Sequence, residues 1–304
     1  MTTAFMQSVD LRSADARHSG ALQPINAEQT EISDEGLPFV VRWVSSLSAK
    51  DGEKVSLPGG PRDPDFNPFL SPDPALTIGA VGDHHVAILN KFPVCDRHLV
   101  LARRLFEEQR APLTLSDFAA ISYVMSGSGG VGFYNGGAEA GASQRHKHLQ
   151  WIPAMQGNAN LRFFVPGLPA GLSEQAMAIH PQLPVKHLFI RVQCGLGTMV
   201  STSASSLLKA FTAACQQLDL LPDDSGLLPP FNFLADNGWM LVVPRSCEHA
   251  YDVSVNALSY GGSLYVRNRD QVDIVRKVGP LEVLSKAAYV ATTTTQPEAL
   301  RRRQ

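Results

Sequence analysis

The stretch from residue 129 to 153 constrains the fold of this chain more than any other part of its sequence. It reads GGVGFYNGGAEAGASQRHKHLQWIP, a loop rich in Gly and Ala that runs into a short alternation of side chains. If the alternating part is a β-strand, His146, His148 and Gln150 lie on one face, about 6.6 Å from one to the next. The other face then receives Lys147, Leu149 and Trp151. A helix would scatter the two histidines and the glutamine around its circumference, so the alternation favours a strand.

Such a row of side chains suits covalent chemistry at phosphorus. Imidazole is uncharged and nucleophilic near neutral pH, because its ordinary pKa is about 6.5. A histidine held at one ring nitrogen by a backbone carbonyl presents its other lone pair in a fixed direction, so it can attack phosphorus and later leave. Backbone N–H groups of the loop can approach phosphate oxygens where no Cβ obstructs them. Gln150 offers an amide N–H to the phosphoryl oxygen.

Two other interpretations of the row stay open on spacing alone. His-x-His on a strand is also a metal-binding pattern, and isolated histidines are often structural. His84 and His85 are candidate additional ligands, but no Asp, Glu or Cys accompanies them at ligand spacing. We therefore predict no metal site formed by protein ligands.

Composition narrows the class of protein. A chain of 304 residues with 44% hydrophobic content forms one large core or two smaller ones. The net charge of −2 points to neither nucleic acid nor membrane as a partner, so local charges must meet any anionic substrate. The basic candidates in or beside the motifs are Lys50, Lys54, Lys91, Arg97, Arg145, Lys147 and Arg245. Four scattered cysteines and the lack of a signal peptide or long apolar run lead us to expect a cytoplasmic protein.

Short elements are expected through most of the chain. The sequence predicts strands at residues 39–44, 85–89 and 98–102, and a hairpin of residues 231–235 and 239–243 around Asp-Asn-Gly. It predicts helices from Thr114 to Gly127, over residues 205–221, and from Leu281. Because the strands form neighbouring hairpins, we expect an α+β fold of antiparallel sheets with packed helices. Residues 1–34 are expected to be a tail or surface helix, and residues 291–304 a flexible tail.

Several segments occur in an order that is typical of one family. They are NPFL (67–70), HVAILNKFPV (85–94), FEEQ (106–109), GFYNGGAEAGA (132–142), SQRHKHLQ (143–150), WMLVVPRS (239–246) and SVNALSYGGSLYV (254–266). Over residues 35–285 the chain resembles the diadenosine tetraphosphate phosphorylases, or ATP adenylyltransferases. These belong to the histidine-triad superfamily, in the branch that includes the galactose-1-phosphate uridylyltransferases. The resemblance implies a histidine-triad-like catalytic lobe at 35–195 and a smaller C-terminal ATP adenylyltransferase lobe at 196–290.

The resemblance also implies roles for single residues. The middle triad position, His148, is the expected nucleophile, and His146 is expected to orient it through its backbone carbonyl. Gln150 at the third position matches the transferase branch, whereas hydrolases usually carry His there. The expected substrate-contacting residues are Lys50, Asn90, Lys91, Asn135, Gly141, Ala142, Ser143, Gln144, Asn232, Met240 and Arg245. Taken alone, Lys50 and Arg245 read as surface charges and Met240 as a core residue.

The implied reaction is the reversible phosphorolysis of diadenosine tetraphosphate to ATP and ADP through an adenylyl-histidine. Mg²⁺ is expected on the polyphosphate, and the only partners expected are small molecules: the dinucleotide, ATP, ADP and phosphate. A hydrolase or a sugar-1-phosphate nucleotidylyltransferase of the same superfamily is the alternative, and a non-catalytic nucleotide sensor is a third hypothesis. The chain departs from many relatives at Arg145, where they have Pro, and at residues 259–261, where they have Gly-Phe-Ala.

Overall fold

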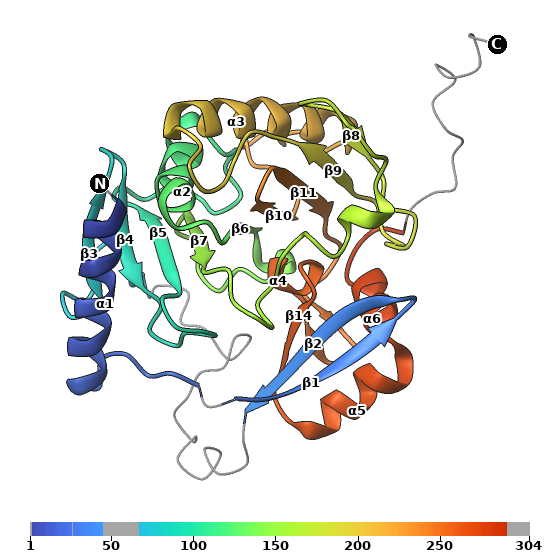
Figure 1. Ribbon diagram of the computed structural model, residues 1–304, viewed down its shortest axis with the longest axis horizontal. Coiled ribbons are helices and arrows are strands. Elements are labelled where there is room, and N and C mark those ends of the chain that lie inside the picture. Colours follow the sequence, from blue (N-terminus) through green and yellow to red (C-terminus); the bar gives the residue numbers. More distant parts are fainter. Residues whose placement is uncertain (1, 26, 45–66, 291–304) are drawn as a thin grey trace.

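The computed structural model describes residues 2–25, 27–44 and 67–290, and its centre is a nine-stranded sheet (Figure 1). The strand order is β3-β4-β5-β7-β6-β10-β11-β9-β8, and every neighbouring pair is antiparallel. A three-stranded sheet of order β1-β2-β14 joins the two ends of the chain, with β14 parallel to β2. Strands β12 and β13 form a small separate pair.

The elements have the following bounds. The strands are β1 Ala27–Asp34, β2 Leu37–Val44, β3 Thr77–Val81, β4 His85–Leu89, β5 Leu99–Arg103, β6 Val131–Gly136, β7 His148–Ile152, β8 Met177–Ala178, β9 Leu188–Arg191, β10 Phe231–Asp236, β11 Trp239–Pro244, β12 His249–Ala250, β13 Val253–Ser254 and β14 Ser263–Val266. The helices are α1 Thr2–His18, α2 Leu115–Ser128, α3 Val200–Gln217, α4 Ala257–Tyr260, α5 Arg269–Val278 and α6 Pro280–Lys286, with short 3-10 turns η2 Ala138–Ala140 and η3 Val165–Gly167.

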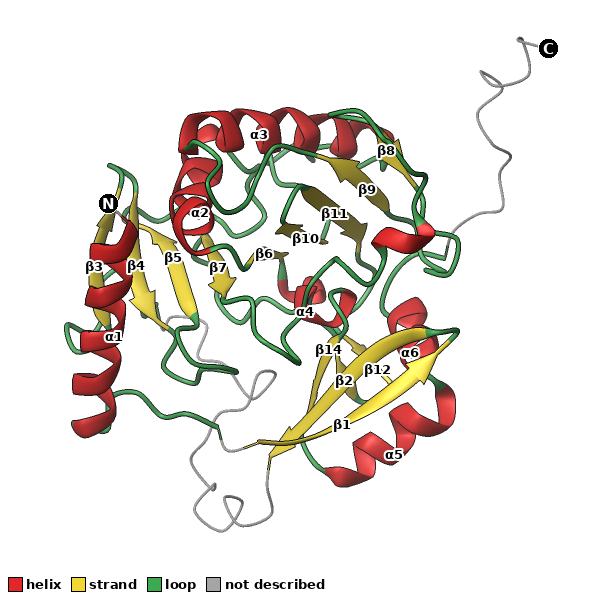
Figure 2. Cartoon of the chain, in the orientation of Figure 1, coloured by secondary structure: helices red, strands yellow, loops and turns green. Residues whose placement is uncertain are grey.

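Two hydrophobic clusters cover the two faces of the large sheet. On one face, α2 and α3 pack against the strands (Figure 2). The rings of Phe118 and Phe211 both contact Phe233 there. On the other face, α4 and the three-stranded sheet close over Phe133 and Leu234. The mixed architecture confirms the predicted α+β fold.

Strand β7 has the two faces that the alternation predicts. Leu149 and Trp151 are buried in the cluster beneath α2 and α3, while His148 and Gln150 belong to the opposite face. His146 lies just before the strand and is joined to Glu108 by an isolated bridge. The row is therefore displayed on the face that α4 partly covers.

Most of the predicted elements are confirmed. The strand at 39–44 lies within β2, β4 pairs antiparallel with β5, and β10 and β11 form the predicted hairpin. At the start of α2, the Thr114 backbone N–H donates to Asp117 Oδ2 (2.8 Å), as the capping spacing predicts. The helix continues past Gly127 to Ser128, because the backbone turns only at Gly129, whose φ is 62°.

The predicted start of α3 at Ser205 is wrong. The helix begins at Val200, because Ser203 belongs to the helix interface and not to a polar cap. Its hydroxyl lies 2.8 Å from the hydroxyl of Ser122 on α2, and both side chains are fully buried. Because the two small hydroxyls form a hydrogen bond with each other, α2 and α3 can pack closely around them. The polar Ser203 was therefore no sign of an exposed position before the helix.

The prediction that residues 1–34 form a tail or a surface helix is wrong for residues 27–34. Residues 27–34 form strand β1, which pairs with β2 along its whole length, and residues 2–18 form helix α1. Strand β1 is polar because it is an edge strand whose outer side chains face solvent.

Strands from both sides of residue 195 share the large sheet, so the predicted lobes 35–195 and 196–290 do not correspond to separate sheets. The segments with Lys50, Lys54 and residues 291–304 lie outside the described residues.

The Lys147 ammonium ties β7 to the elements behind it. It lies 2.8 Å from Glu107 Oε1 and 2.9 Å from Asp117 Oδ2, donates to Pro112 O, and is fully buried. Burial raises the pKa of Asp117, but the hydrogen bond with His85 and the charge of Lys147 outweigh it, so the pKa is well below its ordinary value. Lys147 thus serves the fold, and the expectation that it meets an anionic substrate is wrong.

Replacing Lys147 with Met should lower the free energy of unfolding by about 3–5 kcal/mol, because Asp117 Oδ2 is left buried without its ammonium partner, and Arg103 Nε lies 3.7 Å from the other oxygen. The matched control is Lys186→Met, which removes an exposed ion pair with Asp219 and should cost at most about 1 kcal/mol. Urea unfolding monitored by circular dichroism measures both. Equal losses in the two variants would contradict the structural role of the buried pair.

Candidate active site

His148 is held in one orientation at the start of β7. Its Nδ1–H donates to the backbone carbonyl of His146 (2.7 Å), so Nε2 carries the lone pair. The side chain is 3% exposed. Burial is the largest cause that lowers the pKa of His148 to about 4; the hydrogen bond to the His146 carbonyl raises this pKa and the charge of His146 lowers it, both by less. The ring is therefore neutral at pH 7, as a nucleophile must be.

His146 is fixed through its own ring. Its Nε2–H donates to the carbonyl of Arg103 (2.8 Å), so Nδ1 is an acceptor, and the terminal amide group of Asn67 lies 3.0 Å from it. The rings of Phe69 and Phe106 contact it at edge-on angles. These contacts set the direction of the carbonyl that holds His148, which is the geometry that the expected orienting role requires.

Gln109 is a site residue that the sequence analysis missed. Its side-chain oxygen accepts from the His148 backbone N–H (2.9 Å), and its amide donates to the carbonyls of Asn135 (2.8 Å) and His148 (3.2 Å). A single buried amide thus joins β6 to β7 beside His148. The one available signal was its place in the FEEQ segment, since a lone Gln carries no spacing pattern.

His98 is the second missed residue. Its Nε2–H donates to Gln150 Oε1 (2.9 Å), while its Nδ1 faces the Asn90 amide and the Val94 backbone N–H. Burial lowers the pKa of His98 to about 4, although the bond to Gln150 raises it. Because the neutral ring donates to the oxygen of Gln150, the amide N–H₂ of Gln150 is available to an oxygen elsewhere in the site.

The glycine loop between β6 and β7 is supported from behind. Gly141 has φ of 87°, and a Cβ there would lie 2.8 Å from Asn256 Cβ, so no larger residue fits without rearrangement. Asn232 Nδ2 donates to Asn135 Oδ1 and to the carbonyl of Ala140, both at 2.9 Å. Arg245 donates to Asn232 Oδ1 and is 1% exposed. The amides and the guanidinium thus hold the loop and do not project from it.

The remaining predicted contacts fall into separate groups. Met240 is fully buried beneath α2 and α3, on the sheet face opposite His148, so its predicted substrate contact is wrong. Asn90 and Gln144 are half-buried, Ala142 is buried beside Gly141, and Lys91 and Ser143 are exposed. Two basic candidates are engaged at the surface: Arg97 pairs with Asp10 of α1, and Arg145 pairs with Glu108.

Within the described ranges, no group of three or more His, Cys, Asp or Glu side chains is arranged to hold a metal ion. His85 is bound to Asp117 (2.9 Å) beneath the sheet, and the two triad histidines each donate to a backbone carbonyl. The arrangement favours the nucleophilic interpretation of the row over the metal-binding one.

Comparisons with known proteins place the chain. The family model described as Ap4A phosphorylase N-terminal domain matches residues 1–167, and the model described as ATP adenylyltransferase C-terminal domain matches residues 181–290. Diadenosine 5′,5′′′-P1,P4-tetraphosphate phosphorylase 2 of Saccharomyces cerevisiae is 27% identical over 289 residues, covering 85% of this chain and 86% of the relative. Protein APA1 of the same yeast is 24% identical and covers 92% of each chain.

Solved structures show the same fold. Crystal structures of the yeast Ap4A phosphorylase Apa2 match 95% of this chain and 98% of theirs, with TM-scores of 0.76 and, for the complex with AMP, 0.75 at 22–23% identity. Fold and family models together define the class as a nucleotidyltransferase. The chain belongs to the Ap4A phosphorylase family, which confirms the resemblance inferred from its sequence segments.

The buried neutral histidines make stability depend on pH. The pKa of His98 is about 4 in the folded chain and about 6.5 when unfolded, so the unfolded state binds more protons as the pH falls. Stability is therefore lost as pH falls from 6.5 towards 4. His98→Gln keeps a donor for Gln150 but does not titrate, so its loss of unfolding free energy between pH 7 and 5 should be about 2 kcal/mol smaller than in the parent.

Urea unfolding at the two pH values measures this difference. His84→Gln, which removes an exposed histidine far from Gln150 in the sequence, is the matched control. If His98→Gln loses as much stability on acidification as the parent does, His98 is not held neutral by burial.

Proposed function

We propose that the chain catalyses the reversible phosphorolysis of diadenosine tetraphosphate through an adenylyl group carried on His148. The observation that carries the proposal is the bond from His148 Nδ1–H to the His146 carbonyl, which leaves Nε2 as the nucleophilic atom in a neutral ring. The yeast relatives are named for the same substrate, and one Apa2 structure holds Ap4A.

In the first step, Nε2 attacks an α-phosphorus of the dinucleotide. An N–P bond forms, the bridging P–O bond breaks, and ATP leaves with that electron pair, so no strong general acid is needed. Positive charge develops on the ring as the bond forms, and the His146 carbonyl stabilises the Nδ1–H that carries part of it. Mg²⁺ enters, in this proposal, with the polyphosphate as part of the substrate.

In the second step, an oxygen of inorganic phosphate attacks the adenylyl group. The new P–O bond forms ADP, the N–P bond breaks, and the electron pair returns to Nε2. The reverse direction makes the dinucleotide from ATP and ADP. Gln150 supports transfer over hydrolysis, because its amide, directed by His98, can bond the phosphoryl oxygen without managing a proton of water.

The glycine loop and the expected basic residues have supporting roles. The backbone N–H groups of Gly141 and Ala142 donate within the loop, to the carbonyls of Ala138 (2.9 Å) and Gly137 (3.0 Å). The Ser143 N–H, with Lys91 and Lys50, would gather phosphate oxygens, and Asn135, Asn232 and Arg245 would act by holding the loop. None of the described helices is both long and apolar enough to cross a membrane. Four unpaired thiols among the described residues support a cytoplasmic location.

His148→Ala should lower turnover of diadenosine tetraphosphate by several orders of magnitude, because a covalent nucleophile is lost. With ATP labelled in its α-phosphate, the parent should retain label that is labile in acid and stable in base, as a phosphoramidate is, and the variant should retain none. His84→Ala is the control for removing a histidine. Activity of His148→Ala within tenfold of the parent would exclude the role.

Gln150→His should slow phosphorolysis and raise the share of AMP among the products. Losing one hydrogen bond to developing charge costs about 2–4 kcal/mol, or roughly 30- to 1000-fold in rate. The AMP-to-ADP ratio at saturating phosphate, for parent and variant together, decides the matter. An unchanged ratio would assign acceptor choice to the basic residues that gather phosphate.

A further inference from the structure

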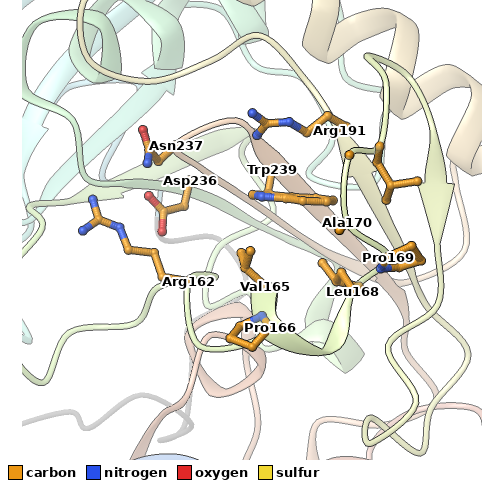
Figure 3. Close-up of a pocket in the computed structure, with 12 residues that line it drawn as sticks. Arg162, Val165, Pro166, Leu168, Pro169, Ala170, Arg191, Asp236, Asn237 and Trp239 are labelled. Carbon is orange, nitrogen blue, oxygen red and sulfur yellow. The ribbon is translucent and has the colours of Figure 1, made fainter.

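A cavity of about 680 Å³ lies away from the triad row (Figure 3). Its walls come from residues 162–172, the end of β9 and the turn between β10 and β11. Asp236 at this end of β10 is four residues beyond Asn232, about 13 Å along the strand. The buried side chains of Phe133 and Leu234 belong to the core between the cavity and the triad row. No residue of the triad row lines the cavity.

One wall of the cavity is a flat, positively charged surface. The Arg191 guanidinium lies over the Trp239 ring, 5.3 Å from its centroid, and Arg191 Nη1 donates to the carbonyl of Gly238 (2.7 Å). The arginine is thereby fixed on the ring. In Figure 3, Trp239 lies between Arg191 and the apolar side chains of Val165 and Leu168. The guanidinium covers one face of the half-exposed Trp239, and the opposite face, toward Val165 and Leu168, is the one that can stack on a planar ring in the cavity.

The other side of the cavity carries hydrogen-bonding groups and a second cation. Arg162 is exposed, and its guanidinium makes no hydrogen bond or ion pair with any described residue. Asp236 is 4% exposed and accepts from the Leu161 backbone N–H (3.1 Å). The Asn237 side chain lies beside Asp236 at the same side (Figure 3). A planar ring with polar edges would find both donors and acceptors here.

We propose that this cavity is an accessory binding site for an adenine nucleotide. The base stacks at Trp239, its exocyclic amino group and ring nitrogen meet Asp236 and Asn237, and the phosphate meets Arg162. The Asn237 amide and the Asp236 carboxylate match the hydrogen-bond donor and acceptor on the edge of adenine. The cavity has two guanidinium groups, of Arg162 and Arg191, and one carboxylate, so its net positive charge favours an anionic ligand. The volume lies within the range of small-ligand pockets. The site is additional to the one proposed at His148 and does not depend on the reaction there.

The test compares binding of labelled AMP by equilibrium dialysis, up to millimolar concentration. The parent should bind one equivalent more than Arg162→Glu, which changes an exposed side chain and should fold normally. Arg269→Glu is the matched control, an exposed arginine on α5, and should bind as the parent does. Because the comparison counts a difference, it holds whether or not His148 binds AMP. Equal binding by parent and Arg162→Glu would overturn the proposal.

Two further measurements define the occupant. Photolabelling with 8-azido-ATP, followed by peptide mapping, should mark residues 162–172 or 236–240 in the parent and not in Arg162→Glu. Ribose 5-phosphate, which lacks the base, should displace AMP from this site at least tenfold less well than unlabelled AMP does. Equal displacement would show a simple phosphate site and overturn the assignment to a nucleotide.

Discussion

The buried ammonium of Lys147 is the interaction on which the geometry of the site depends. It lies between the two triad histidines in the sequence and points into the opposite side of the sheet, where Asp117 and Glu107 receive it. Desolvating this lysine is costly unless its partners stay in place, so β7 cannot rotate or slip without losing them. A one-residue slip would bring Lys147 to the substrate face and carry His148 into the core.

The front of the strand is held by neutral hydrogen bonds. The His146 carbonyl and the Gln109 side chain both hold His148, the His98 ring holds Gln150, and none of the three brings a net charge to the row. Burial keeps His148 and His98 unprotonated at neutral pH. The described residues therefore place uncharged imidazoles in the triad row at neutral pH, which suits the nucleophilic role proposed for His148.

The pairing of β6 with β10 unites residues from the two halves of the chain. It sets Asn135 opposite Asn232, which lets their side chains bond and lets Arg245 reach the same loop. This explains why Arg245 is buried although an isolated arginine is usually exposed. The C-terminal segment therefore completes the support of the glycine loop.

The sequence by itself determined the strand with its two faces, the hairpin of β10 and β11, the start of α2 and the triad row. These follow from local periodicity and turn chemistry, which depend on near neighbours. Family segments added the enzyme class. Only the tertiary structure decided that Gln109 and His98 hold the row, that Lys147 and Met240 face away from it, and that Ser203 is buried. Such contacts join residues far apart in the chain, and burial and hydrogen-bond partners at that range leave no periodic trace in a single sequence.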